Sequence, residues 1–132
     1  HPIYKTITHH DGMDFTAATG TPIYATADGV VEKSTYDRGG YGQHVIINHG
    51  YGYKTLYAHM NEIKTKRGTK VKRFDIIGYV GNTGLSLGPH LHYEVHHNGT
   101  KENPSYYYHA DLTPDEYNKL IELSSKENQS FD

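Results

Sequence analysis

The sequence predicts a mainly β protein that carries one short α-helix near its C-terminus. Fourteen glycines in 132 residues separate short apolar runs, which is typical of strands joined by turns. The turn-forming pairs Asp28-Gly29, His49-Gly50 and Asn98-Gly99 stand between these runs. After Thr113 the spacing of the apolar residues changes to that of a helix.

The apolar runs place the strands in order along the chain. We expect strands at 13–15, 23–25, 29–36, 44–48, 54–59, 76–80 and 90–96. The uninterrupted run Val45-Ile46-Ile47 predicts a central strand that is buried on both faces. Within 54–59, the alternation of side chains places Tyr57 and His59 on the same face.

The segment Thr113-Pro114-Asp115-Glu116 has the features of a helix start. Thr113 suits the N-cap, proline suits the first helical position, and Glu116 completes a capping box. Leu120 and Ile121 follow as apolar anchors. We therefore expect a helix at 113–125 that packs on the sheet, followed by a loose polar tail at 126–132.

Length and composition limit the classes of function. A chain of 132 residues fits a single domain over 1–132. The net charge of −2 and the lack of a long basic run argue against nucleic acid as a partner. The sequence has no apolar run long enough for a transmembrane segment. It also has no cysteine, so any metal must be bound by histidine or carboxylate side chains, and there are 11 histidines.

The strand predicted at 90–96 has one polar and one apolar face. Alternation directs its apolar side chains toward the core, namely Leu91, Tyr93 and Val95. The opposite face carries His90, His92, Glu94 and His96. Such a strand suits the floor of a cleft. His90 and His92 are neighbours on this face, so both could bind one metal, or one could bind it while the other acts on the bound water. Glu94 and His96 would support a ligand or simply bond to a neighbour.

A second cluster of potential metal ligands lies far upstream, at His10 and Asp14. A bend at Gly12 would let the two side chains converge. His9 competes for the ligand role, but only His10 completes the pattern His-x-Gly-x-Asp. Together with His92, these residues would give zinc three protein ligands and leave a fourth position open, as in catalytic sites. The metal would lower the pKa of its water from ~16 toward ~7, which points to metal-assisted hydrolysis.

Hydrolysis also needs groups that move protons near that water. Strand geometry places His90 there, and His59 at the end of 54–59 is the second candidate. We expect His90 to be the base, because it lies closer to the ligand His92. The spacing of these residues leaves open which of the two histidines accepts the proton and which one donates to the oxyanion.

These motifs, in this order, resemble the lysostaphin-like (LytM-type) zinc endopeptidases. The opening of that family is similar to His10-x-Gly-x-Asp14 followed by Gly20-Thr21-Pro22-Ile23-Tyr24-Ala25. The family's tyrosine-x-histidine segment is matched by Leu56-Tyr57-Ala58-His59-Met60. Its last motif is matched by Gly88-Pro89-His90-Leu91-His92-Tyr93-Glu94. The resemblance covers a catalytic core at about 10–104, after an N-terminal segment at 1–9.

The resemblance implies a compact antiparallel β fold with its site in a groove between loops. It implies one zinc ion on His10, Asp14 and His92, with His59 and His90 as the catalytic histidines. The implied substrate is the peptide part of bacterial peptidoglycan, cut at a D-Ala–diaminopimelate cross-link or at a glycine bridge. Because peptidoglycan lies outside the cytoplasmic membrane, the resemblance also implies an extracytoplasmic location.

Two further expectations concern the surroundings of the site. For the walls of the groove we expect Tyr36, Tyr41 and the loop from Asn82 to Ser86. Members of the family often carry Gly-x-Arg just before a pair like His1-Pro2, so we expect a strand or a regulatory region before residue 1. A non-catalytic module of the same fold, which binds peptidoglycan or activates an amidase, is the alternative function. A purely structural or storage metal site is the second alternative.

Overall fold

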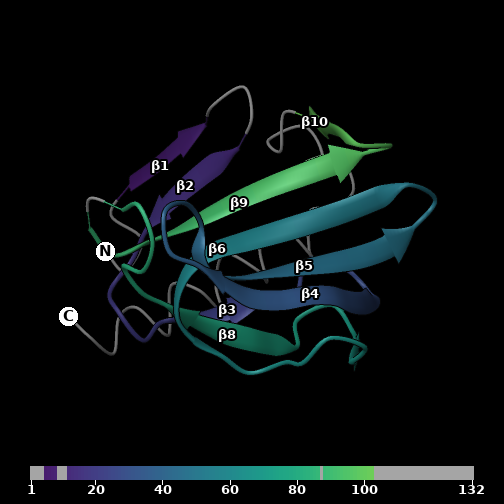
Figure 1. The fold of residues 1–132 in the computed structure, drawn as a ribbon, viewed down its shortest axis with the longest axis horizontal. Helices are drawn as coiled ribbons and strands as arrows, with labels where there is room; N and C mark the ends of the chain where they lie inside the picture. The colour runs from purple at the N-terminus through teal and green to yellow at the C-terminus, as the bar shows by residue number, and fades with distance from the viewer. Residues whose placement is uncertain (1–4, 9–11, 87, 103–132) are drawn as a thin grey trace.

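The computed structural model describes residues 5–8, 12–86 and 88–102 (Figure 1). All the regular elements within these residues are strands. They are β1 (Lys5–Thr8), β2 (Met13–Thr16), β3 (Pro22–Tyr24), β4 (Gly29–Asp37), β5 (Gly42–Gly50), β6 (Tyr53–Ile63), β7 (Lys70–Val71), β8 (Ile76–Val80), β9 (His90–His97) and β10 (Thr100–Glu102). The mainly β prediction is therefore confirmed. The helix predicted at 113–125 and the tail at 126–132 lie outside the described residues.

The strands predicted from the apolar runs are all present. Their bounds agree closely, and β6 differs most, because it continues beyond the predicted end at His59 to Ile63. The prediction missed β1, β7 and β10. These strands are short and rich in threonine, lysine and glutamate, so no apolar run marks them in the sequence. β7 and β10 each pair with a longer strand, and β1 pairs with β2, which has the same length.

One antiparallel sheet contains all the strands of the described residues. Its strands follow the order β1-β2-β9-β6-β5-β4-β7, and Figure 1 shows this order from β1 to β4. Strand β8 pairs with β6 and β3, and β10 pairs with β9. The hairpin between β5 and β6 turns at Tyr51 and Gly52, whose φ angles of 54° and 83° match the type I′ turn that suits twisted strands. The antiparallel arrangement implied by the family resemblance is confirmed.

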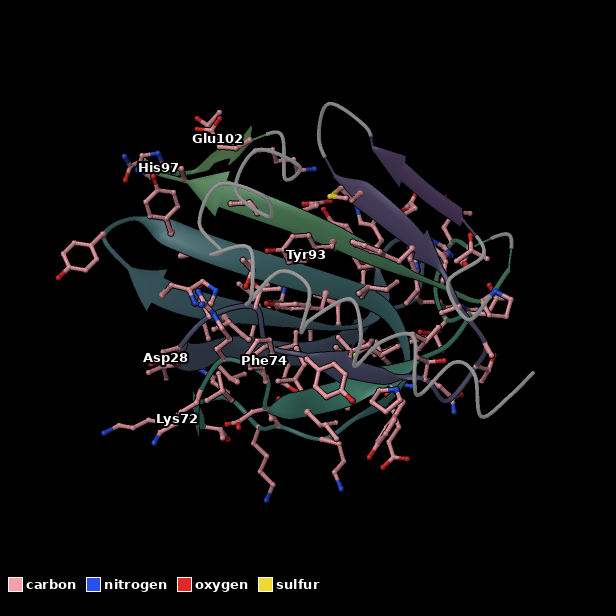
Figure 2. The ribbon with its side chains drawn as sticks, turned by 180° about the vertical axis from the view of Figure 1, so that it is seen from behind. Asp28, Lys72, Phe74, Tyr93, His97 and Glu102 are labelled. Atoms are coloured by element: carbon pink, nitrogen blue, oxygen red, sulfur yellow. The ribbon has the colours of Figure 1, made fainter. Side chains whose placement is uncertain are left out.

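The core lies on one side of this sheet, against β3 and β8. Its buried apolar cluster includes Met13, Phe15, Ile23, Val45, Ile47, Tyr57, Met60, Ile77, Tyr93 and Val95. Figure 2 views the molecule from the side on which Tyr93 and Phe74 lie. Val45 and Ile47 are fully buried, but Ile46 on the opposite face is only half-buried, so the prediction that this strand is buried on both faces is wrong at Ile46. That opposite face carries the polar residues of the site.

Candidate metal and catalytic centre

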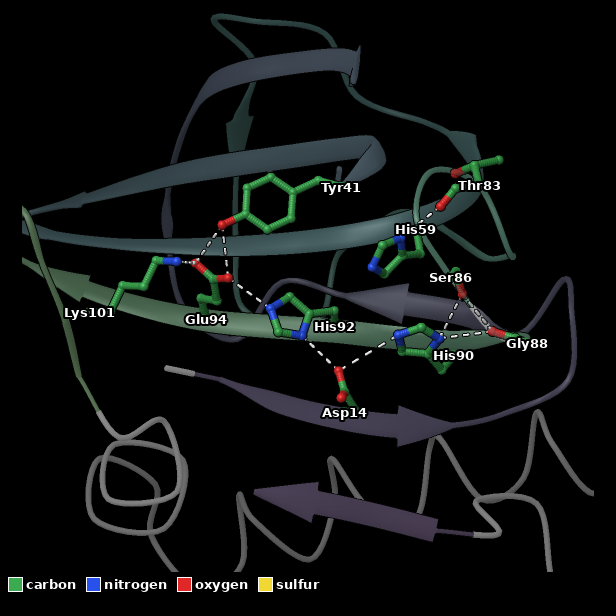
Figure 3. Close-up of polar contacts among 10 residues, drawn as sticks. All are labelled: Asp14, Tyr41, His59, Thr83, Ser86, Gly88, His90, His92, Glu94 and Lys101. Carbon is green, nitrogen blue, oxygen red and sulfur yellow. Dashed lines mark hydrogen bonds and ion pairs between the residues drawn. The ribbon is translucent and has the colours of Figure 1, made fainter. Parts of the chain in front are cut away.

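The pairing of β2 with β9 brings two of the predicted metal ligands together. Asp14 lies directly opposite His92, so both side chains share one face of the sheet. Their neighbours Met13 and Tyr93 face each other in the core instead. The Nδ1 atom of His92 lies 2.7 Å from Asp14 Oδ1, although the two residues are 78 positions apart. The next pair on the same face, Thr16 and His90, places His90 Nε2 at 3.7 Å from the same oxygen (Figure 3).

His59 reaches this group through a β-bulge in β6. The pairing of β5 with β6 shifts register between Gln43 and Val45, and His59 adopts the left-handed φ of 63°. The extra residue turns the His59 ring to the face of His90 and His92, at centroid distances of 4.7 and 6.1 Å. Simple alternation predicted that His59 shares a face with Tyr57. That prediction is wrong, because Tyr57 points into the core.

A buried carboxylate holds the far side of the His92 ring. Glu94 is only 2% exposed, and its Oε2 lies 2.7 Å from His92 Nε2. It also accepts hydrogen bonds from His96 Nε2 at 2.7 Å and from the Tyr41 hydroxyl at 2.9 Å. Burial raises the pKa of Glu94, but the hydrogen bonds from His92, His96 and Tyr41 outweigh it and hold the pKa well below its usual range. Glu94 is therefore an anion that binds the Nε2–H of His92.

The charges on both sides of His92 affect its titration. Burial lowers the pKa of His92, but the hydrogen bonds to Glu94 and Asp14 outweigh burial, so the net shift is upward. With Nε2–H donated to Glu94, Nδ1 is the atom that meets Asp14. A cation on Nδ1, whether a proton or a metal ion, would be stabilised by the Asp14 carboxylate. Imidazole nitrogen and carboxylate oxygen are donors that zinc accepts, so this pair fits a zinc site.

The third predicted ligand, His10, lies outside the described residues, as do His9 and Asp11. The described residues alone include no group of three histidine, cysteine or carboxylate side chains that could hold a metal. The role of His10 therefore stays a prediction. The structure shows that Asp14 and His92, which lie 78 positions apart in the sequence, come together.

Gly12 gives the His92 ring the space that it occupies. A Cβ atom at Gly12 would lie 2.7 Å from His92 Cε1 and 2.9 Å from the Tyr93 carbonyl oxygen. Such a contact is too short for a real side chain. The φ angle of Gly12 is not positive, so close approach of the ring, rather than left-handed backbone, requires glycine at this position.

We predict that Gly12→Ala displaces the His92 ring. The added methyl should lower the free energy of unfolding by about 1–3 kcal/mol, the usual cost of overpacking. It should also weaken zinc binding. Gly39→Ala is the matched control, since a Cβ there meets nothing within 4 Å. Thermal unfolding and zinc titration of both variants test this; equal behaviour of the two would contradict the close packing at Gly12.

The two remaining histidines of the group are held by backbone carbonyls. His59 Nδ1 lies 2.7 Å from the Thr83 carbonyl oxygen, and His90 Nδ1 lies 2.8 Å from that of Gly88. The Ser86 hydroxyl is 3.1 Å from the same His90 nitrogen. A carbonyl can only accept, so both rings carry their proton on Nδ1 and keep Nε2 as an acceptor when neutral. Burial and the nearby His90 and His92 lower the pKa of His59, although the Thr83 carbonyl opposes this.

These side chains line an open cleft of about 330 Å³. Its walls are formed by Asp14, Asp37, Gly40, Tyr41, His59, Leu85, His90 and His92. Of the residues expected in the groove walls, Tyr41 lines the cleft. Ser86 instead contacts His90, Tyr36 is 57% exposed on β4, and Asn82 is exposed beside Thr83. Leu85, which belongs to the expected loop from Asn82 to Ser86, also lines the cleft. The sequence did not predict Asp37 and Gly40, because turn residues do not indicate how far a loop reaches.

Comparisons with known proteins find similar sequences over most of this chain. The sequence model of peptidase family M23 matches residues 8–104. An uncharacterized metalloprotease of Haemophilus influenzae is 48% identical over 104 residues, which are 79% of this chain and 22% of that protein. The peptidoglycan DD-endopeptidase ShyC of Vibrio cholerae is 46% identical over 104 residues, 79% of this chain and 24% of that protein. This chain thus spans less than a quarter of these relatives.

Solved structures share the fold. The catalytic domain of the antimicrobial peptidase lysostaphin from Staphylococcus simulans matches with a TM-score of 0.69 and 31% identity, over 74% of this chain and 77% of that chain. A zinc-containing peptidase from Vibrio cholerae matches with a TM-score of 0.67 and 39% identity, over 70% of this chain and 28% of that chain. The described part of this chain includes no helix that could span a membrane.

Proposed function

Because this chain belongs to peptidase family M23, we propose that it is a zinc-dependent endopeptidase that hydrolyses amide bonds in the peptides of bacterial peptidoglycan. One observation carries the proposal: Asp14 and His92 meet at 2.7 Å on the floor of an open cleft that His90 and His59 also line. The relatives named DD-endopeptidase support a D-Ala–diaminopimelate cross-link as the substrate, rather than a glycine bridge. Such a substrate would place the protein outside the cytoplasm.

The proposed ligands of the zinc ion are His10, Asp14 and His92. When bound, zinc polarises the scissile carbonyl group and lowers the pKa of a water molecule. The role of Asp14 and Glu94 is to hold His92 from both sides, so that its ring enters the site with Nδ1 toward Asp14. Tyr41 stabilises Glu94: burial and the carboxylate raise the pKa of this tyrosine, so its hydroxyl keeps the proton that it donates.

His90 is the proposed base. Its Nε2 lies 3.7 Å from Asp14 Oδ1, and its Nδ1–H is bound to the Gly88 carbonyl. The neutral ring can therefore take a proton from the attacking water and return it to the leaving amine. His59 also presents an unprotonated Nε2, since Thr83 binds its Nδ1–H. In the neutral ring, Nε2 can accept a hydrogen bond from the water. It can donate a hydrogen bond to the oxyanion only after it has gained a proton.

We predict that Glu94→Gln weakens zinc binding about 10- to 100-fold, the loss typical when a partner that orients a metal ligand is changed. The amide keeps the size of the side chain but removes the charge that binds His92, His96 and Tyr41. Glu32→Gln is the matched control, because Glu32 pairs with Lys54 outside the cleft. Competition with a chromogenic chelator measures both affinities. Wild-type affinity in Glu94→Gln would contradict the proposed support of His92.

Digestion of purified peptidoglycan sacculi tests the function. The zinc-loaded protein should release new amino groups, and a chelator should stop the release until zinc is restored. Mass spectrometry of products from defined muropeptides then identifies the bond. Binding to sacculi without new amino groups would contradict the proposal and favour a non-catalytic peptidoglycan-binding or amidase-activating module.

A further inference from the structure

Thr83 contacts the catalytic region without lining the cleft. It lies in the loop between β8 and β9, and its carbonyl oxygen is 2.7 Å from His59 Nδ1. We propose that Thr83 is the positioning residue that fixes the ring of His59 for the peptidase reaction. This inference rests on the proposed function, because it concerns the orientation of His59, which is a proposed catalytic histidine.

The side chain of Thr83 ties its loop to both strands of the bulge. Its hydroxyl donates to the carbonyl oxygen of Met60 at 2.6 Å, and Met60 follows His59 in β6. The same hydroxyl accepts the backbone N–H of Gln43 in β5 at 3.0 Å. Those strands are the two whose register shifts at this point. One threonine thus binds the backbone on both sides of the bulge and the imidazole that projects from it.

Two glycines allow the loop to approach this closely. A Cβ atom at Gly42 would lie 2.4 Å from the Thr83 carbonyl group, and one at Gly84 would lie 2.3 Å from the Gly42 nitrogen. Both glycines have positive φ angles, of 66° and 76°. Leu85 N–H also donates to the Gly40 carbonyl at 2.8 Å. These close approaches place the Thr83 carbonyl beside the turn between β4 and β5, and the two hydrogen bonds of the Thr83 hydroxyl fix its direction.

The backbone of His59 needs such support. A left-handed φ is unfavourable for a residue with a side chain, and it persists where surrounding contacts enforce it. The His59 N–H donates to the Tyr41 carbonyl at 2.8 Å, while its ring donates to Thr83. With Nδ1–H fixed in this way, Nε2 is the acceptor that faces the cleft beside His90 (Figure 3). Loss of the Thr83 hydroxyl should release the carbonyl, the ring tautomer and the ring orientation together.

The test compares Thr83→Val, which has nearly the same shape but no hydroxyl, with Thr83→Ser, which keeps the hydroxyl. We expect kcat of Thr83→Val to fall by up to about 100-fold, the loss that follows a misplacement of ~1 Å at a catalytic group. KM and zinc content should stay unchanged, and Thr83→Ser should recover most of the activity. Thr21→Val is the matched control, because Thr21 also donates to a backbone carbonyl, that of Ala18, but lies outside the cleft.

Nitrogen-15 NMR of the histidine rings gives a readout that does not depend on peptidase activity. In the wild-type protein His59 should be the Nδ1–H tautomer, and in Thr83→Val it should become a mixture. A wild-type His59 with its proton on Nε2 would overturn the inference even if the valine variant failed to fold. So would a folded Thr83→Val with unchanged kcat, or a loss no greater than in Thr21→Val. A wild-type protein that cleaves no sacculi would instead refute the proposed function, while the NMR result would still test the contact.

Discussion

His90→Ala is expected to abolish cleavage of peptidoglycan peptides while zinc remains bound. Removing a positioned acid–base group typically costs about 10²- to 10⁴-fold in rate. His90 is not a proposed ligand: its Nε2 lies 3.7 Å from Asp14, and its Nδ1 is bound to the Gly88 carbonyl. Its loss should therefore remove the proton acceptor but leave the Asp14–His92 pair in place. Initial rates on muropeptides, together with the zinc content of the purified variant, measure both effects.

The control for this variant is His97→Ala. His97 lies on the same strand, β9, but its ring stacks on Tyr53 at a centroid distance of 4.0 Å, outside the cleft. This control should turn over at close to the wild-type rate. Near-normal turnover by His90→Ala would refute its role as the base. Loss of zinc from His90→Ala would show instead that this histidine binds the metal.

Asp14→Asn is expected to lose both zinc and activity. The substitution keeps the size of the side chain but removes the charge that faces His92 Nδ1 at 2.7 Å. As a proposed ligand, Asp14 should matter more than a residue that only hydrogen-bonds a ligand, whose loss costs about 10- to 100-fold in metal affinity. We therefore expect a decrease in zinc affinity larger than 100-fold. Chelator competition measures the affinity, and circular dichroism checks that the variant is folded.

Asp37→Asn is the control for this second prediction. Asp37 lines the same cleft, so the substitution removes an equal charge from the same cavity. Asp37 is not among the groups that contact His92. If both variants bound zinc with equal affinity, the carboxylate of Asp14 would have no special role in metal binding.

The strands and the polar face of β9 could be predicted from local pattern. Apolar runs between turn residues located the long strands, and the period of two separated Tyr93 and Val95 from Glu94 and His92. The convergence of Asp14 with His92 depends on the register between β2 and β9, 78 residues apart, and spacing alone does not give that register. The family resemblance predicted this set of ligands, and the structure shows the register that joins two of them.

The position of His59 shows where alternation fails. One extra residue in a bulge changes the face of every side chain that follows. No residue type in 54–59 indicates that a bulge is present. The contacts of Thr83 and the position of Gly12 depend on loops and rings that approach from distant parts of the chain. Sequence pattern identifies such residues as turn formers, whereas only the packed structure shows what they touch.

A single zinc ion is proposed to bind between Asp14 and His92, with His10 as the third ligand. Anomalous diffraction at the zinc absorption edge, from crystals of the zinc-loaded protein, tests it most directly. We predict one peak at about 2.0–2.2 Å from a carboxylate oxygen of Asp14, from Nδ1 of His92 and from a ring nitrogen of His10. A peak bound by Glu94 or His96, or one beyond the reach of Asp14, would contradict it.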